Sequence, residues 1–145
     1  VLTEGSFGPF EALARELGIR ERIEVRSVPE RELHAELGRA HVTVNPRPRC
    51  DGVPQKNLNY MAASTALVAF AGSLHPCRDG ETGVAVAPVS GDALGEALLS
   101  LLARPSDRTR LGRAARAAVE RDYTWARQAG RMTEVYQRVL KAQQP

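Results

Sequence analysis

The stretch from His41 to Gly72 reads HVTVNPRPRCDGVPQKNLNYMAASTALVAFAG. A short β-branched run at 41–45 is followed by a polar loop at 46–53, a helical pattern at 54–64 and a second apolar run at 66–72. This order predicts two parallel strands joined by a crossover helix, because parallel neighbours need a long connection between them. The stretch therefore predicts an α/β fold.

The same alternation continues on both sides of this stretch. Further strands are predicted at 23–27 and 83–88, with another beginning at Val1, and helices are predicted at 9–18, 28–40, 91–105, 106–123 and 124–143. Gly18 is suited to ending the helix at 9–18, and Ser106 is suited to capping the helix at 106–123. The last helix is amphipathic, so its apolar face needs a surface to pack on. The pattern predicts a Rossmann-like open parallel sheet flanked by helices.

Length and composition narrow the class of protein. The 145 residues fit one domain, and the 20 Lys+Arg and 17 Asp+Glu residues are interspersed, so a nucleic-acid partner is not required. No apolar run is long enough to cross a membrane and no secretory signal opens the chain, which favours a cytoplasmic location. Cys50 and Cys77 lack the spacing of a metal or redox motif and are predicted to be free thiols.

The polar loop lies where open parallel sheets bind ligands, beyond the carboxyl end of the strand that ends at Asn45. Pro54 is well suited to the first turn of the helix that follows, and the free N–H groups of such a turn favour an anion such as a diphosphate. Lys56 would add a point charge, and Arg47 or Arg49 a bidentate fork. For each arginine, a solvated loop face is the alternative.

A resemblance to a known family spans nearly the whole chain. It rests on the segments LARELGIRERIEV, VPERELHAELGRAHVTVNP, NYMAAS, LVAFAG, DGETGVAVAP, DALGEALLSLLARPSDRTRLGRAARAAVERDYTW and VYQRVL, in this order. Together they resemble the C-terminal, donor-binding domain of GT-B fold retaining glycosyltransferases, of the group 1 (family 4) type that includes sucrose synthases and bacterial mannosyltransferases. The resemblance implies that residues 1–145 form one domain that binds a UDP- or GDP-sugar. The N-terminal acceptor domain and the first strand of this domain would then lie upstream of Val1.

The resemblance also assigns roles to individual residues. The family commonly has two glutamates separated by seven residues, and Asp51 and Asn59 occupy those positions. Asp51 would lie beside the donor sugar, Asn59 would pair with the ribose hydroxyls, and Lys56 would stabilise the leaving diphosphate. Ser64 and Ala66 stand where a glycine and a proline are usual. If that glycine has a left-handed backbone in the family, Ser64 is strained here.

The remaining donor-binding residues come from the two loops and the helix between them. They are Arg49, Gly52, Val53, Pro54, Tyr60, Gly72 and Ser73. Gly52 would let backbone amides approach the donor, or simply form an Asp-Gly turn, and Tyr60 either borders the base or belongs to the core. The nucleotide sugar would be a substrate, and neither a cofactor nor a metal is expected.

Two other functions remain open. The residues at 59, 64 and 66 also suit a catalytically degenerate domain of the same fold that binds or scaffolds a partner. The arginine-rich helix at 108–121, with the tail helix, could face anionic lipid or RNA, although interleaved acids favour a solvated face. The resemblance leaves room for peripheral membrane association of the full-length protein. Because the family's basic pair from the first loop is upstream, the isolated fragment is expected to turn over little or nothing.

Overall fold

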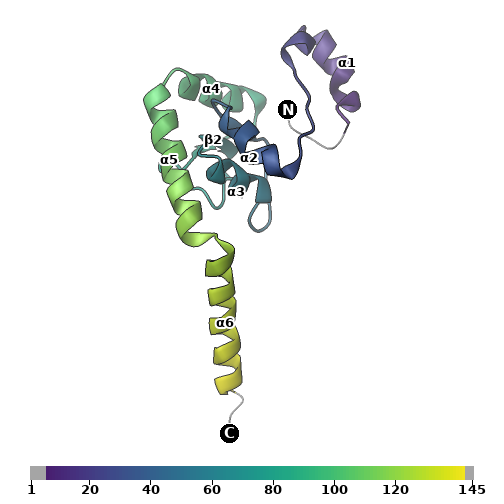
Figure 1. Cartoon of the computed structure of the whole chain (residues 1–145). Coiled ribbons are helices and arrows are strands. Elements are labelled where there is room, and N and C mark those ends of the chain that lie inside the picture. Colours follow the sequence, from purple (N-terminus) through teal and green to yellow (C-terminus); the bar gives the residue numbers. More distant parts are fainter. Residues whose placement is uncertain (1–5, 143–145) are drawn as a thin grey trace. The chain divides into compact units, whose positions relative to one another are not determined.

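A computed structural model describes residues 6–142 of the chain (Figure 1). The strand predicted to begin at Val1, and the last residue of the predicted tail helix, lie outside that range. The chain divides into two compact units, Val1–Leu33 and His34–Pro145.

The first unit contains helix α1 (Gly8–Glu16) and the short 3₁₀ helix η1 (Arg20–Arg22). The predicted first helix is confirmed, and Gly18, with φ of 65°, follows its end in the left-handed conformation. Arg20 Nε donates to Glu11 Oε2 at 2.6 Å, which ties η1 to α1.

The strand predicted at 23–27 is wrong. Of these residues only Arg26 takes part in a β-bridge, and it is an isolated one. The N–H of Ile23 donates to the carbonyl of Arg20, and the carbonyl of Ile23 accepts from the Arg20 guanidinium at 2.9 Å. Both backbone groups of Ile23 are thus bonded locally, so its β-branched side chain does not lead to a ladder.

The second unit is built on a parallel sheet of three strands in the order β1-β2-β3. The strands are β1 (Thr43–Asn45), β2 (Leu67–Phe70) and β3 (Val84–Val86). Thr43 pairs with Leu67, and Phe70 with Val86. Helix α3 (Gln55–Ala62) is the crossover between β1 and β2, as predicted, and α2 (Glu30–Gly38) precedes β1.

Three helices follow the sheet: α4 (Gly91–Leu102), α5 (Pro105–Asp122) and α6 (Trp125–Ala142). Ser90 caps α4, accepting a hydrogen bond from the N–H of Ala93 at 3.1 Å. The predicted cap at Ser106 is wrong, because α5 begins one residue earlier and Arg104 is its N-cap residue. Pro105 is suited to that first position, since it has no N–H to satisfy and its φ is already helical.

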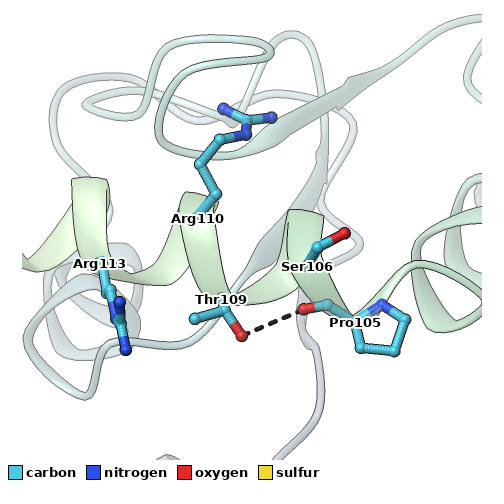
Figure 2. A pocket seen from close by; sticks show the side chains of 5 residues that line it. All are labelled: Pro105, Ser106, Thr109, Arg110 and Arg113. Carbon is cyan, nitrogen blue, oxygen red and sulfur yellow. Dashed lines mark hydrogen bonds between the residues drawn. The ribbon is translucent and has the colours of Figure 1, made fainter.

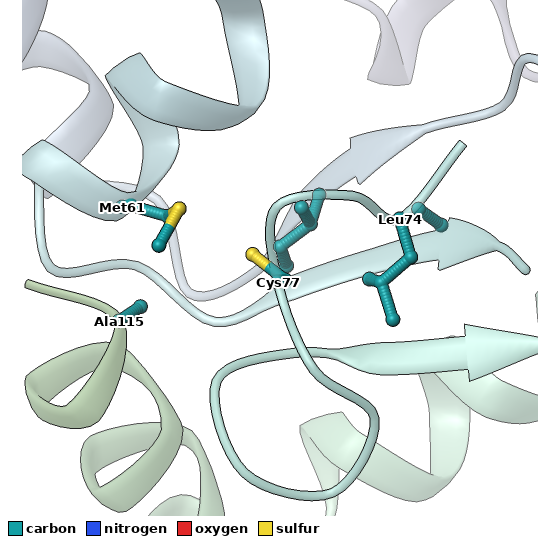
Figure 3. Packing of buried hydrophobic residues seen from close by; sticks show 6 residues of the cluster. Met61, Leu74, Cys77 and Ala115 are labelled. Atoms are coloured by element: carbon teal, nitrogen blue, oxygen red, sulfur yellow. The ribbon is translucent and has the colours of Figure 1, made fainter. Parts of the chain in front are cut away.

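Two apolar clusters form the core of the second unit, and β2 contributes to both. One contains Met61, Leu67, Ala69, Leu74, Cys77 and Ala115, and the other Ala66, Val68, Phe70, Val86, Leu101 and Leu111. Alternate residues of β2 belong to alternate clusters, as expected for a strand buried on both faces. Figure 3 shows Met61 of α3 and Ala115 of α5 near Cys77, which belongs to the loop that follows β2.

The turn between α3 and β2 packs against α5. Ser64 in this turn has φ of 58°, so its backbone has the left-handed conformation that would strain a residue other than glycine. A Cβ atom on Gly112 of α5 would lie 2.1 Å from the Ser64 carbonyl oxygen, so only glycine fits there.

Helix α6 differs from the other long helices because none of its residues is buried. Its exposed apolar side chains are Trp125, Met132, Val135, Tyr136, Val139 and Leu140. The predicted amphipathic pattern is therefore present, but its apolar face is exposed in the described structure. No helix in the described part of the chain is long and apolar enough to span a membrane.

Candidate functional site

Two loops meet at the carboxyl ends of β1 and β2. Arg49, in the loop after β1, forms a parallel bridge with Gly72, in the loop after β2. The N–H of Cys50 donates to the Gly72 carbonyl at 3.0 Å. A Cβ atom on residue 72 would lie 2.5 Å from the carbonyl oxygen of Pro48, so this approach requires glycine. The structure thus brings together the two strand ends on which the predicted site residues lie.

The tip of the first loop is exposed. Asp51 Oδ1 lies 3.3 Å from Arg49 Nη2, and the two side chains are 91% and 83% exposed. Gly52 has φ of 79°, and a Cβ atom added there would meet nothing within 4 Å among the described residues, which fits the predicted Asp-Gly turn. Val53 is 42% exposed. The loop therefore presents a carboxylate, a guanidinium and a turn to solvent beside the sheet edge.

One cation, Lys56, lies in the first turn of α3, and a second, Arg47 of the loop after β1, lies near enough to repel its charge. Pro54 is the N-cap residue, one position before the predicted first turn, and no side chain caps the helix. Burial lowers the pKa of Lys56, and the positive charge of Arg47 lowers it further. Among the described residues no carboxylate pairs with either side chain. An unneutralised lysine in the first turn of a helix, with a second cation near it, forms an environment that favours an anion.

The other predicted residues of α3 are arranged by helical spacing. Lys56, Asn59 and Tyr60 are neighbours on the helix surface, since residues three and four apart share a face. Asn59 is half-buried. Tyr60 packs against the first core cluster, and its burial raises the pKa of the phenol. Tyr60 therefore belongs to the core, which is one of its two predicted roles. Its contact with a nucleotide base, the other role, stays a prediction.

Ser73 is held inside the second loop. Its hydroxyl donates to the carbonyl of Phe70 at 3.2 Å, and the side chain is buried. Its own carbonyl accepts from the side chains of Asn57 and Asn45. The hydroxyl of Ser73 thus closes the turn after β2, and the role of this residue in donor binding stays a prediction.

Asn45 and Asn57 are the residues of this region that were not predicted. Both are 0% exposed, and the Nδ2 of Asn45 donates to the Oδ1 of Asn57 at 3.1 Å. The signal was present in the sequence: Asn57 precedes Met61 by four residues, so a polar side chain shares the inward face of α3 with a core methionine. A buried amide needs hydrogen-bond partners, and here the partners are the other amide and backbone groups of the two loops.

A separate hollow of about 590 Å³ lies on α5 and contains none of the predicted site residues (Figure 2). Its lining residues are Pro105, Ser106, Thr109, Arg110 and Arg113. Thr109 donates to the Pro105 carbonyl at 3.1 Å, and Arg110 donates to the Gly80 carbonyl at 3.0 Å, so these groups already bond other parts of the fold.

Among the described residues, no group of three His, Cys, Asp or Glu side chains is placed to hold a metal ion.

Most of the chain matches the model of one protein family. The model of the group 1 glycosyl transferases matches residues 5–118. No curated protein matches the chain. Sucrose-phosphate synthase from Thermosynechococcus elongatus has a similar structure, with 25% sequence identity and a TM-score of 0.83 over 93% of this chain and 34% of that one.

Two further solved structures have the same fold. HepE from Anabaena, in complex with UDP, matches 94% of this chain and 39% of its own, with a TM-score of 0.83 at 10% identity. The C-terminal domain of the group 1 glycosyl transferase LpcC from Francisella tularensis matches 81% of this chain and 62% of its own, with a TM-score of 0.67 at 18% identity. The chain spans 34% of the sucrose-phosphate synthase and 39% of HepE.

Proposed function

Because the chain belongs to the group 1 glycosyl transferases, we propose that it is the donor-binding domain of a retaining enzyme that transfers a sugar from a UDP- or GDP-sugar to an acceptor. Its fold is the Rossmann-like C-terminal half of a GT-B glycosyltransferase. HepE, which shares this fold, was crystallised with UDP and with UDP and glucose. A nucleotide sugar is the ligand class that these relationships favour.

The observation that carries the proposal is Lys56 in the first turn of α3, with the positive charge of Arg47 near it. Lys56 has a lowered pKa because it is partly buried and because Arg47 repels its charge. A diphosphate bound there would neutralise both side chains and accept hydrogen bonds from the first turn of α3. The same groups would stabilise the negative charge that grows on the diphosphate when the sugar leaves.

The other residues follow from their positions around this anion site. Asp51, on the exposed loop tip, would bind hydroxyls of the donor sugar. Asn59, one turn along α3 from Lys56, would hydrogen-bond the ribose. Arg49 and the backbone at Gly52, Val53, Gly72 and Ser73 would contact the donor from the two loops, which lie side by side. We expect neither a metal nor another cofactor, and no general base from this chain.

Transfer itself would need an N-terminal acceptor domain, so the isolated chain is expected to bind donor weakly and not to turn over. The proposal of a further domain is supported by the share of the solved relatives that the chain spans, 34% of sucrose-phosphate synthase and 39% of HepE.

The proposal can be tested by isothermal titration of the protein with UDP, GDP and ADP, followed by the matching nucleotide sugars. Lys56→Ala and Arg47→Ala are each expected to weaken binding about tenfold or more, because each removes a charged partner of the diphosphate. The matched control is Lys141→Ala, which removes the chain's other lysine from the exposed end of α6.

Failure of every nucleotide to bind would contradict the proposed function. It would instead favour a domain of the same fold that binds or scaffolds a partner, a function that the residues at 59 and 64 also suit. Equal weakening by Lys141→Ala would show that the effect of Lys56→Ala comes from net charge and not from a site.

A further inference from the structure

We propose that Asn57 and Asn45 form an amide clamp that positions both loops of the donor site, and that nucleotide binding depends on this clamp. The term amide clamp refers to these two side chains and their hydrogen bonds. The part of the inference that concerns nucleotide binding rests on the proposed function. The clamp acts through the backbone, so both asparagines are positioning residues.

Asn57 holds the loop after β2. Its Nδ2 lies 2.8 Å from the carbonyl oxygen of Ser73, 3.2 Å from that of Leu74 and 2.9 Å from that of His75. An amide group has two N–H donors, so three consecutive carbonyls share them. Three successive peptide groups that converge on one side chain of α3 leave this segment little freedom to move relative to that helix.

Asn45 connects this arrangement to the loop after β1. Its Nδ2 donates to Asn57 Oδ1 at 3.1 Å and lies 3.4 Å from the Ser73 carbonyl oxygen, while its Oδ1 accepts from the N–H of Arg47 at 3.5 Å. A continuous series of hydrogen bonds therefore runs from Arg47 through both amides to His75. It supplements the direct bond between the loops, from Cys50 N–H to the Gly72 carbonyl.

Each residue of the amide clamp lies close in sequence to one cation of the proposed anion site. Asn57 follows Lys56 in the first turn of α3, and Asn45 bonds the backbone N–H of Arg47. The separation of the two cations is therefore set by β1, α3 and the clamp between them. Both amides are fully buried, where water cannot replace a lost hydrogen bond without structural change. Loss of the clamp would alter the separation of the cations without removing either charge.

The first experiment is hydrogen–deuterium exchange on the unliganded protein, because it tests the clamp without any nucleotide. In Asn57→Ala, peptides covering both 46–53 and 72–76 are expected to exchange about tenfold faster or more, since buried hydrogen bonds are lost. Asn57→Ser is the milder second variant if Asn57→Ala does not fold. Leu101→Ala is the control, because it truncates a fully buried side chain of α4 in the other core cluster.

Faster exchange at 72–76 alone, or at neither loop, would overturn the coupling of the two loops. So would the same pattern in Leu101→Ala, because it would reflect global loss of stability. The second experiment compares nucleotide affinity by titration with UDP and GDP. Asn57→Ala and Asn45→Ser are expected to bind about tenfold more weakly, and Leu101→Ala as wild type at a temperature where all variants are folded.

The two experiments separate failure of the inference from failure of the proposed function. If wild type binds a nucleotide and the Asn57 variants bind it equally well, the clamp does not position the site. If wild type binds none, the proposed function fails and the exchange experiment still decides whether the clamp couples the loops.

Discussion

Gly112 of α5 lies directly against the carbonyl group of Ser64, and a Cβ atom on residue 112 would stand 2.1 Å from the oxygen and 2.9 Å from the carbon. The neighbouring atoms are backbone atoms, which cannot turn aside as a flexible side chain can. This contact seats α5 against the turn between α3 and β2.

Gly112→Ala is therefore expected to lower the free energy of unfolding by about 1–3 kcal/mol, the usual range for overpacking a core. Urea denaturation measures the difference. Gly95→Ala in α4 is the control, because a Cβ atom there meets nothing within 4 Å, and it should be neutral or slightly stabilising. A Gly112→Ala protein as stable as Gly95→Ala would show that α5 can shift at little cost.

Ser64→Gly should have the opposite effect. The serine has φ of 58°, a conformation that costs an L-residue about 1 kcal/mol and a glycine much less. We expect the substitution to raise the free energy of unfolding by about 0.5–1 kcal/mol. Ser64→Ala separates the causes, because it removes the hydroxyl but keeps the Cβ atom. A gain in Ser64→Ala as large as that in Ser64→Gly would locate the penalty in the hydroxyl.

The two thiols should differ in reactivity. Both are free, with Cys50 half-buried and Cys77 buried in the first core cluster. Burial raises the pKa of Cys77 from 9.0 to about 11, although a hydrogen bond with Thr82 partly opposes this. At about pH 8, the buried Cys77 forms very little thiolate in the folded protein. A disulfide reagent such as DTNB should therefore react quickly with Cys50 in the native protein and with Cys77 only after unfolding. Cys50→Ser should abolish the fast phase, and a fast phase that persists would contradict the assignment.

The same pKa has a consequence for stability. Since the pKa of Cys77 is higher in the folded than in the unfolded chain, its contribution is complete below about pH 9 and is lost as the pH rises towards about 11. Urea denaturation across this range should show stability falling with pH. Cys77→Ala should show a smaller fall, and an identical slope in both proteins would mean that other groups control alkaline unfolding.

Asp51 and Arg49 should matter for ligand and not for folding. Their side chains are 91% and 83% exposed, and solvent screens an ion pair of that kind. Asp51→Asn is expected to leave the free energy of unfolding unchanged. In the proposed site it should weaken binding of UDP-glucose or GDP-mannose more than binding of UDP or GDP, because Asp51 would contact the sugar. Equal weakening of binding for the sugar nucleotide and the free nucleotide would show that Asp51 does not contact the sugar.

The sequence was informative where one local pattern controls the structure. The alternation of the apolar run at 66–72 with the helical pattern at 54–64 predicted a strand after a crossover helix, and β2 and α3 are found there. Local patterns were misleading where a different local feature determined the backbone, either a hydrogen bond or a proline. Ile23 has its N–H and carbonyl bonded to Arg20, and Pro105 begins α5 one residue before the predicted cap.

The candidate site could be located from sequence, but its internal arrangement could not. The loop at 46–53 and the start of α3 are marked by polar residues and a proline between apolar segments. The approach of Arg49 to Gly72, and the bonds from Asn57 to the loop after β2, join residues that are far apart along the chain. Such contacts depend on the packed sheet, so periodicity alone does not reveal them.

Strand β2 supplies side chains to both apolar clusters, Leu67 and Ala69 to one and Val68 and Phe70 to the other. We therefore expect the two faces of the sheet to unfold together, because exposing either cluster removes contacts of the same strand. The loop at 73–75 begins three residues after this strand and is bonded to α3 by Asn57. A ligand that binds this loop is consequently expected to raise the free energy of unfolding of the whole second unit, including α4 and α5.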